Sequence, residues 1–312
     1  MGEISVYDLL IIGAGPAGLT AGLYAGRYRL NCAIFEALLP GGQILLSPTI
    51  ENYPGFPGGI STDELVANMK KQVDDLGVEI KQEAVSAVTA DVFQAHPVYS
   101  VKSESGEFKA RTLIIASGAH WKKLGVPGEE KLIGRGVSYC GTCDAPLFRD
   151  KEIVVVGGGD KAIEEAIYLT KYASKVTLVH RRQGFRAAQI LVEKARENPK
   201  INFVLDSRVE SIFGESKVSG VVIKNTAGGA VSNIDCAGVF IFVGVSPNTD
   251  FIHAELARDS GGFIETDNAM ATSLQGVFAC GDCRSKTLYQ VISACGEGAV
   301  AGNSAHTYLI ST

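Results

Sequence analysis

The chain has 312 residues, enough for two domains of ordinary size that each bury a core. Apolar residues make up 46% and charged residues 20%, which is typical of a globular protein and excludes a disordered one. The net charge of −5 gives no basic patch for nucleic acid, and no apolar run reaches the roughly 18 residues that span a membrane. Residues 1–7 lack the features of a signal peptide, so we expect a cytoplasmic location.

A dinucleotide-binding pattern opens the chain. The apolar run 7–12 predicts a buried parallel strand, which leads into the glycine pattern 13–18 and a helix to about Arg27. A second strand, 32–35, ends in Glu36, whose carboxylate can accept hydrogen bonds from ribose hydroxyls. This order predicts a nucleotide with an unmodified ribose, as in FAD or NAD, against the alternative of a structural glycine turn. The predicted contacts are Gly13, Gly15, Pro16, Ala17, Gly18 and Glu36.

Loops rich in glycine and proline follow at 40–44 and 51–58. Long loops beside a nucleotide fold tend to line its site, so their polar side chains are candidates for contacts with a polar ring. Amides that merely face water in turns are an equal alternative. After a predicted helix from Leu65 to Leu76 and a small sheet to Val101, the run 112–118 predicts another buried strand that ends at glycine. The predicted contacts here are Gly42, Gln43, Asn52, Ala116 and Gly118.

The opening pattern is repeated from residue 151. The strand 151–156 precedes a second glycine pattern, a helix predicted from about Ala162 to Tyr172, and a strand at 175–179. This strand ends in histidine and arginine instead of an acid, and arginine there accommodates a ribose 2′-phosphate. The repeat therefore predicts an NADPH site, with a solvated basic cluster as the alternative. The predicted contacts are Gly157, Gly159, Asp160, Ala162, His180, Arg181, Arg182 and Arg186.

Two cysteines lie between the two glycine patterns. Cys140 and Cys143 are three residues apart, and Asp144 follows directly. Such a pair can form a small disulfide ring whose thiols are activated, and a neighbouring carboxylate can move a proton. Half of a zinc site or two buried small residues are the alternatives. The second Cys-x-x-Cys, at 280–283, lies far beyond the spacing of about 15–20 residues that separates the pairs of ribbon-type zinc sites, so we predict no metal.

The last segment carries no fingerprint of its own. The strand 238–244 closes the second nucleotide domain, and the strand 276–279 delivers an aspartate that can hold a sugar alcohol such as flavin ribityl. The helix predicted from Tyr289 to Tyr308 contains small residues that permit close packing. This segment most simply completes the first domain. The predicted contacts are Gly281, Asp282, Gln290 and Val291.

These patterns predict an α/β protein with two Rossmann-like nucleotide-binding domains. Each has a central parallel sheet and a smaller antiparallel layer, and the NADPH-binding domain is inserted into the FAD-binding domain. The predicted boundaries are 1–119 and 248–312 for the FAD-binding domain and 120–247 for the NADPH-binding domain, which carries the cysteine pair.

The order of the motifs along the whole chain resembles the low-molecular-weight thioredoxin reductases of the flavoprotein disulfide reductase class. The resemblance rests on the two fingerprints, the Gly-Gly-Gln and Glu-Asn-Tyr-Pro-Gly loops, Cys-x-x-Cys-Asp, His-Arg-Arg with Arg186, and the late Gly281-Asp282. In larger relatives, such as glutathione and lipoamide reductases, the redox cysteines lie beside the first fingerprint. Here they lie between the fingerprints, which indicates the small type.

The resemblance implies a relay. NADPH would reduce FAD, reduced FAD would reduce a Cys140–Cys143 disulfide, and the dithiol would reduce thioredoxin or a thioredoxin-like protein. It further implies that Cys143 is nearest the flavin, that Cys140 attacks the partner, and that Asp144 is the acid or base. A homodimer is implied too, as is rotation of the NADPH-binding domain about linkers near 118–123 and 244–249.

Several residues depart from the family pattern. Lys161 replaces a small hydroxyl residue, Gly141 stands where alanine is usual, and Tyr289 stands where arginine is common. Cys280, Cys283 and Cys295 are interpreted as small buried residues in preference to a second redox pair. Two rival functions remain, an FAD-dependent oxidase that forms disulfides with oxygen and a nucleotide-binding redox sensor without turnover. The arginine cluster argues against the oxidase, which has no use for a 2′-phosphate site.

Overall fold

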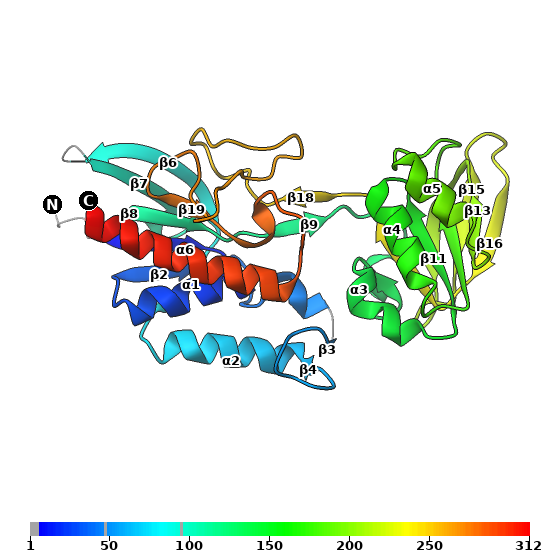
Figure 1. The fold of residues 1–312 in the computed structure, drawn as a ribbon, viewed down its shortest axis with the longest axis horizontal. Helices are drawn as coiled ribbons and strands as arrows, with labels where there is room; N and C mark the ends of the chain where they lie inside the picture. The colour runs from blue at the N-terminus through cyan, green and yellow to red at the C-terminus, as the bar shows by residue number, and fades with distance from the viewer. Residues whose placement is uncertain (1–5, 47–48, 94–95) are drawn as a thin grey trace. The chain divides into compact units, whose positions relative to one another are not determined.

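The computed structural model describes residues 6–46, 49–93 and 96–312. The chain divides into two compact units, one formed by residues 1–120 with 246–312 and the other by residues 121–245 (Figure 1). Both units combine parallel strands with helices, so the predicted α/β class with two Rossmann-like domains is confirmed. In the described part of the chain, no helix combines the length and apolar character needed to cross a bilayer.

The first unit is built on a seven-stranded sheet in the order β5-β2-β1-β8-β7-β6, with β19 pairing with β8. The long strand β8 pairs with β1 along one edge. Its other edge pairs first with β7, antiparallel, and then with β19, parallel. The antiparallel strands β6 and β7 share β8 with the main sheet, and their side chains pack with those of β1 and β2 in one core cluster, so they form the smaller antiparallel layer that was predicted. The strands are β1 (Val6–Ile12), β2 (Cys32–Phe35), β5 (Glu79–Lys81), β6 (Val85–Phe93), β7 (His96–Ser103), β8 (Gly106–Ile115) and β19 (Val277–Ala279).

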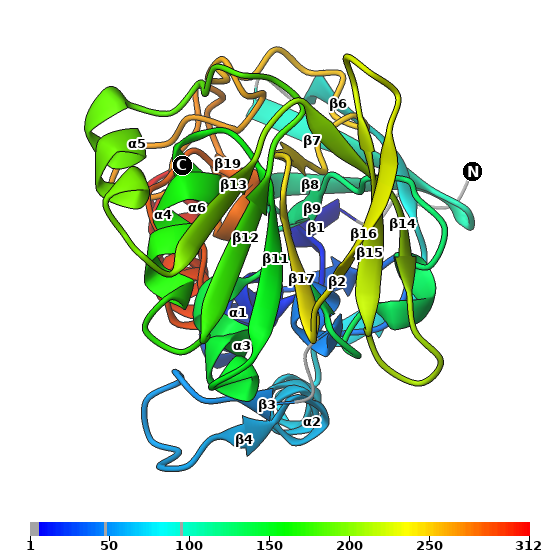
Figure 2. The same cartoon turned by 90° about the vertical axis from the view of Figure 1, so that its right-hand side faces the viewer.

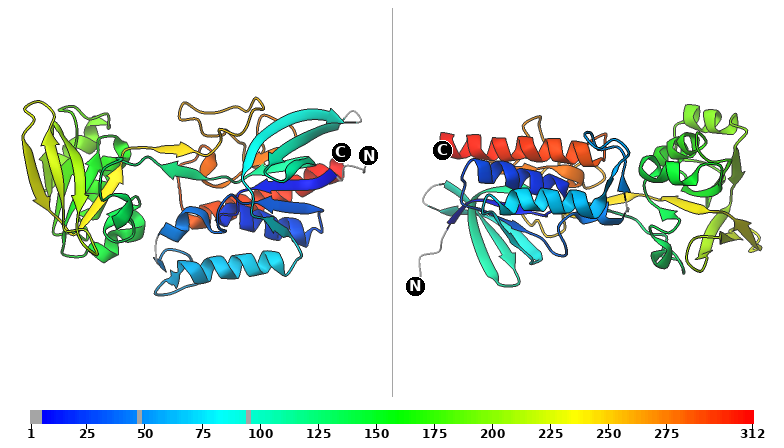
Figure 3. Two further views of the ribbon diagram at one scale, coloured as in Figure 1. Left: turned by 180° about the vertical axis from the view of Figure 1, so that it is seen from behind. Right: turned by 90° about the horizontal axis from the view of Figure 1, so that it is seen from below.

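Three helices, α1 (Pro16–Arg27), α2 (Thr62–Asp74) and α6 (Val291–Ser311), lie side by side along this sheet (Figure 3). Alternate side chains of β1 pack toward them, as the two-residue period of a strand requires. The contact between α1 and α6 is close, because Gly298 of α6 faces the backbone of Ala17 in α1 without a side chain between them. A short 3-10 turn, η1 (Gly42–Leu46), and the pair β3 (Thr49–Ile50) and β4 (Ile60–Ser61) complete the unit's N-terminal half.

The second unit has a parallel sheet in the order β10-β17-β11-β12-β13. Helices α4 and α5 pack with one set of alternating side chains of β11, and an antiparallel three-stranded sheet packs with the other set (Figure 2). The elements are β10 (Val137–Ser138), α3 (Gly141–Asp144), β11 (Glu152–Gly157), α4 (Asp160–Leu169), β12 (Lys175–Val179), α5 (Gln189–Arg196), β13 (Ile201–Val204), β14 (Ser207–Phe213), β15 (Gly220–Asn225), β16 (Val231–Asp235) and β17 (Gly238–Phe242), with 3-10 turns η2 (Glu130–Leu132) and η3 (Ala145–Phe148).

The chain passes from the first unit to the second after residue 120 and returns after residue 245. The two passages, β9 (Ala119–Trp121) and β18 (Val245–Pro247), pair with each other as a two-stranded sheet. Glycines flank this pair: Gly118 has a φ of 67° and Gly244 a φ of 132°, a region that favours glycine.

Helix ends differ from the sequence prediction where polar capping residues precede the apolar pattern. Helix α2 begins at Thr62 and not at Leu65, because the Ser61 hydroxyl accepts a hydrogen bond from the Glu64 N–H at 3.1 Å. Helix α6 begins at Val291, two residues later than predicted, because Gln290 and Ser293 form a capping box. Helix α4 runs from Asp160 to Leu169, whereas the sequence predicted about Ala162 to Tyr172, and no side chain caps its start at Gly159.

Candidate functional site

Cys140 and Cys143 form a disulfide, with Cα atoms 5.3 Å apart. The bond closes the first turn of α3, and both cysteines are partly exposed. The Cys143 N–H donates to the Cys140 Sγ at 3.2 Å, and the Cys140 N–H donates to the Ser138 hydroxyl at 3.1 Å. Asp144, the last residue of α3, is partly buried. Because the two thiols are joined, they cannot also act as the thiolate ligands of a zinc ion.

A buried carboxylate fixes the residue before the disulfide. The Tyr139 hydroxyl donates to Glu129 Oε1 at 2.8 Å, and Glu129 is 1% exposed. The same carboxylate accepts backbone N–H groups from Leu124 at 2.9 Å and Gly125 at 2.8 Å. Burial, and then the hydrogen bond to Glu129, raise the pKa of Tyr139, so this hydroxyl stays protonated. Glu129 was not predicted from the sequence, since nothing local marks a carboxylate that pairs with a tyrosine ten residues later.

The other five cysteines are free and buried in the structure. Burial raises the pKa of Cys32 and of Cys236 to about 12 and that of Cys283 to about 11. Burial also raises the pKa of Cys280 and of Cys295. Cys280 and Cys283 are not bonded to each other. No group of three or more His, Cys, Asp or Glu side chains in the described residues is arranged to hold a metal ion.

This contrast predicts a selective labelling pattern. After mild reduction at pH 8, iodoacetamide should modify Cys140 and Cys143 and leave the five buried thiols unmodified, because a raised pKa keeps a thiol neutral and a neutral thiol is a poor nucleophile. Peptide mass spectrometry of the native, labelled protein measures this. Denatured protein is the control, in which all seven cysteines should react. Modification of any third cysteine at a comparable rate in the native protein would contradict the assignment.

The first glycine pattern forms the turn between β1 and α1. Gly13 has a φ of 106°, and a Cβ there would lie 2.4 Å from the carbonyl oxygen of Ala116. A Cβ on Gly18 would lie 1.8 Å from the Gly13 carbonyl oxygen, so this position packs helix against strand. Gly15 is different, because nothing lies within 4 Å of its Cβ position. The open side of Gly15 leaves room for a ligand to approach the backbone at the start of α1.

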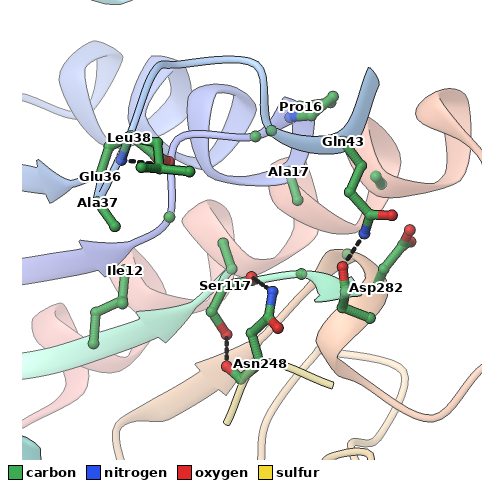
Figure 4. A pocket seen from close by; sticks show the side chains of 18 of the residues that line it. Ile12, Pro16, Ala17, Glu36, Ala37, Leu38, Gln43, Ser117, Asn248 and Asp282 are labelled. Atoms are coloured by element: carbon green, nitrogen blue, oxygen red, sulfur yellow. Dashed lines mark hydrogen bonds between the residues drawn. The ribbon is translucent and has the colours of Figure 1, made fainter. Parts of the chain in front are cut away.

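A cavity of about 670 Å³ opens above this turn, within the first unit. Figure 4 shows residues of β1, α1 and η1 on its walls together with Ser117, Asn248 and Asp282. Most of the residues predicted for the first nucleotide line it, whereas Gly18 and Asn52 do not. The predicted residues that line the cavity are Gly13, Gly15, Pro16, Ala17, Glu36, Gly42, Gln43, Ala116, Gly118, Gly281, Asp282, Gln290 and Val291.

The polar side chains of the cavity are already held by the protein. Glu36 accepts the Ala14 N–H at 2.7 Å. It also accepts the Leu38 N–H at 3.0 Å (Figure 4). The Gln43 side-chain amide donates to the carbonyl of Ala119. The Asn52 amide donates to Gln290 Oε1 at 2.9 Å, so Asn52 can act on the cavity only through Gln290. These contacts fix the direction of each group and leave further oxygen lone pairs for a ligand.

Three more residues were not predicted from the sequence: Ser117 and Asn248 line the cavity, and Lys286 pairs with Asp282, which lines it. Asn248 and Ser117 exchange hydrogen bonds: the Ser117 hydroxyl donates to the Asn248 carbonyl at 2.6 Å, and the Asn248 amide donates to the Ser117 carbonyl at 3.0 Å. Lys286, whose side chain is 5% exposed, pairs with Asp282 Oδ1 at 2.9 Å and with Glu297 at 3.4 Å. The charge of Asp282 is therefore partly balanced inside the protein.

The second glycine pattern lies between β11 and α4. A Cβ on Gly157 would lie 2.5 Å from the Phe242 carbonyl oxygen, whereas nothing lies within 4 Å of the Cβ position of Gly159. Ala162 is fully buried and packs beside Gly157. Asp160 accepts the Ala188 N–H at 2.7 Å and so ties the loop after β12 to the start of α4.

The basic residues after β12 separate into two kinds. Arg181, Arg182 and Arg186 are exposed, and the Arg186 N–H donates to the Gly158 carbonyl at 2.9 Å. His180 is 9% exposed and stacks on Phe185. Burial lowers the pKa of His180, and its ring occupies the space that a Cβ on Gly158 would need. His180 thus packs against Gly158 of the glycine loop, whereas the three arginines remain at the surface.

Comparisons with known proteins agree with this geometry. The pyridine nucleotide-disulphide oxidoreductase family matches residues 7–298. The chain is 43% identical over 311 residues to the thioredoxin reductase of Bacillus subtilis, covering 99% of this chain and 96% of that one. It is 42% identical over 311 residues to that of Peptoclostridium acidaminophilum, covering 98% of each. The crystal structure of the Streptococcus pyogenes thioredoxin reductase aligns with a TM-score of 0.91 at 45% identity, covering 99% of this chain and 100% of that one. The chain therefore belongs to the pyridine nucleotide-disulphide oxidoreductases and, within them, to the thioredoxin reductases.

Proposed function

We propose that this chain uses NADPH to reduce the disulfide of thioredoxin or a thioredoxin-like protein, through FAD and the Cys140–Cys143 pair. The observation that carries the proposal is a partly exposed disulfide in a chain with two dinucleotide-binding folds. Family membership supports it, since the relatives are named thioredoxin reductases. The proposed domains are 1–119 with 248–312 for FAD and 120–247 for NADPH.

The cavity of the first unit fits FAD. Gly15 leaves the backbone open beside the N-terminus of α1, where a pyrophosphate is favoured. Glu36 would accept hydrogen bonds from the ribose of the adenosine half, and Asp282 would accept one from ribityl. Gln43 and Gln290 would contact the polar edge of the ring system.

The second unit fits NADPH. Gly157 and Gly159 would bring the pyrophosphate to the start of α4, and the exposed Arg181, Arg182 and Arg186 would bind the 2′-phosphate. We assign His180 to the support of this loop and not to direct contact, because its ring is buried.

Bound FAD would supply two-electron chemistry between the nicotinamide and the disulfide. The disulfide would take up two electrons and two protons, with Cys143 nearest the flavin and Asp144 giving or taking a proton. Cys140 would then attack one sulfur of the partner disulfide, and Cys143 would displace the reduced partner and re-form the bond. We assign the attack to Cys140 because the Cys143 N–H points at its sulfur and would stabilise a thiolate there.

Turnover would also need the second unit to move, because nicotinamide and disulfide belong to one unit and the flavin to the other. We place the hinges at 118–123 and 244–249, where Gly118 and Gly244 can absorb backbone change. We further propose a cytoplasmic homodimer. Five free cysteines are typical of a reducing compartment, and the family resemblance supports the dimer.

The test is an assay of purified protein with NADPH and thioredoxin, followed by the loss of NADPH absorbance. Oxidation should depend on thioredoxin, and NADH should give a kcat/KM at least about tenfold lower, since one charged hydrogen bond contributes roughly 1.5–3 kcal/mol. An equal rate of NADPH oxidation with and without thioredoxin would contradict the function. A preference for NADH would contradict the arginine assignment alone. Oxygen-dependent formation of disulfides in a dithiol substrate would favour the oxidase.

A further inference from the structure

The carboxylate of Glu165 is buried on α4 without full compensation. The residue is 3% exposed, and its Oε1 pairs with the Lys161 ammonium at 2.5 Å. Its Oε2 is shielded from solvent and has no hydrogen-bond partner. Buried polar atoms are almost always hydrogen-bonded, and a buried charge is costly unless it is paired on all sides. The position of this oxygen therefore calls for an explanation.

The free oxygen lies against the redox turn. A Cβ built on Gly141 would lie 1.9 Å from Glu165 Oε2 and 2.9 Å from its Cδ. With the carboxylate in this position only glycine fits at 141, and Gly141 is the residue directly after Cys140. Gly141 and Lys161 thus meet at one side chain, that of Glu165. Lys161 pairs with Oε1 of the carboxylate, and the missing side chain of Gly141 leaves space for Oε2.

The net charge beside the disulfide is negative. The side chain of Lys161 is 62% exposed, so water screens its charge, whereas the side chain of Glu165 is 5% exposed. On the turn itself, Asp144 adds a second carboxylate, and on the preceding segment Glu129 is bound to the Tyr139 hydroxyl.

The negative charge affects the reduced pair more than the disulfide. The disulfide is neutral, but the dithiol can form a thiolate, which a nearby negative charge disfavours. A dithiol that is less stabilised as a thiolate gives up its electrons more readily.

We propose that Glu165 sets the reducing strength of the Cys140–Cys143 pair: its buried carboxylate, held by Lys161 and admitted by Gly141, disfavours the reduced pair and makes it a stronger reductant. This rests on the proposed function, in which the pair passes electrons to a partner. Glu165 would act on the pair through its charge, from its position against Gly141.

The test measures the reduction potential of the pair in the holoenzyme. Protein is equilibrated with mixtures of reduced and oxidised dithiothreitol, quenched by alkylation, and the Cys140–Cys143 peptide is quantified by mass spectrometry. Glu165→Gln should shift the equilibrium constant about tenfold toward the dithiol, which corresponds to a potential about 30 mV less negative. Glu164→Gln is the matched control, because Glu164 is the neighbouring but exposed carboxylate of the same helix, and it should change nothing.

A second variant keeps the charge and moves it. Glu165→Asp withdraws the carboxylate from Gly141 by one methylene and should shift the potential in the same direction by less. The proposal is overturned if neither variant differs from Glu164→Gln. The readout needs neither NADPH nor thioredoxin, so an unchanged potential with intact thioredoxin reduction rejects only this role. A shifted potential without thioredoxin reduction rejects the proposed function and leaves the electrostatic role standing.

Discussion

Cys143→Ser and Cys140→Ser should each lower the rate of thioredoxin reduction about a thousandfold or more. The reaction passes through a disulfide that neither variant can form, and removal of one member of a catalytic pair typically abolishes the whole pathway. NADPH oxidation in the presence of thioredoxin measures the loss. Cys236→Ala, which removes a buried free thiol of the same unit, is the control and should retain activity.

The two variants should differ in what they trap. A thioredoxin with one active-site cysteine, carried as its mixed disulfide with thionitrobenzoate, should form a stable mixed disulfide with Cys143→Ser through the Cys140 sulfur, releasing the thionitrobenzoate anion. It should react slowly with Cys140→Ser, because the N–H that points at Cys140 does not serve the other sulfur. Release is read from absorbance. Equal rates, or a faster reaction of Cys140→Ser, would reverse the assigned roles.

Gly298→Ala should destabilise the first unit by about 3 kcal/mol and lower its FAD content. A Cβ on Gly298 would lie 2.2 Å from the carbonyl oxygen of Ala17, so α6 and α1 would have to separate. Because Ala17 lines the cavity, the same displacement would change the site. Urea unfolding and the flavin absorbance per protein measure the two effects.

The chain supplies a close control two residues away. Gly296 lies on the same helix with nothing within 4 Å of its Cβ position. Gly296→Ala should leave FAD content unchanged and stabilise the helix by up to about 1 kcal/mol, since alanine is the better helix former. Equal effects of the two substitutions would mean that the close helix contact does not limit stability.

The features that the sequence predicted well are those formed by residues close to one another in the chain. The glycine patterns, the apolar strands after them and Glu36 follow one another along the chain, and the structure brings them together as expected. Cys140 and Cys143 are close enough in sequence to form a ring without help from the fold.

What it did not predict are pairings between distant residues. Asn52 has the right chemistry for the cavity, but its amide donates a hydrogen bond to Gln290. No residue near Asn52 in the sequence indicates that partner. His180 is the first residue of the basic run after β12, yet packing against Gly158 buries it. The side chain that fills the space at Gly141 comes from another helix, Glu165 on α4. Such contacts depend on which elements the fold sets side by side.

The insertion of one unit within the other also decides the order of assembly during translation. The sheet of the first unit lacks β19, and its helical layer lacks α6, until the ribosome has made residues 277–311. Residues 121–245 leave the ribosome as a continuous segment with a complete sheet of their own. Domains generally fold as units during synthesis. The unit that starts second is thus complete first, while the one that starts first waits for residues 277–311, which supply the partner of β8 and the helix that packs on α1.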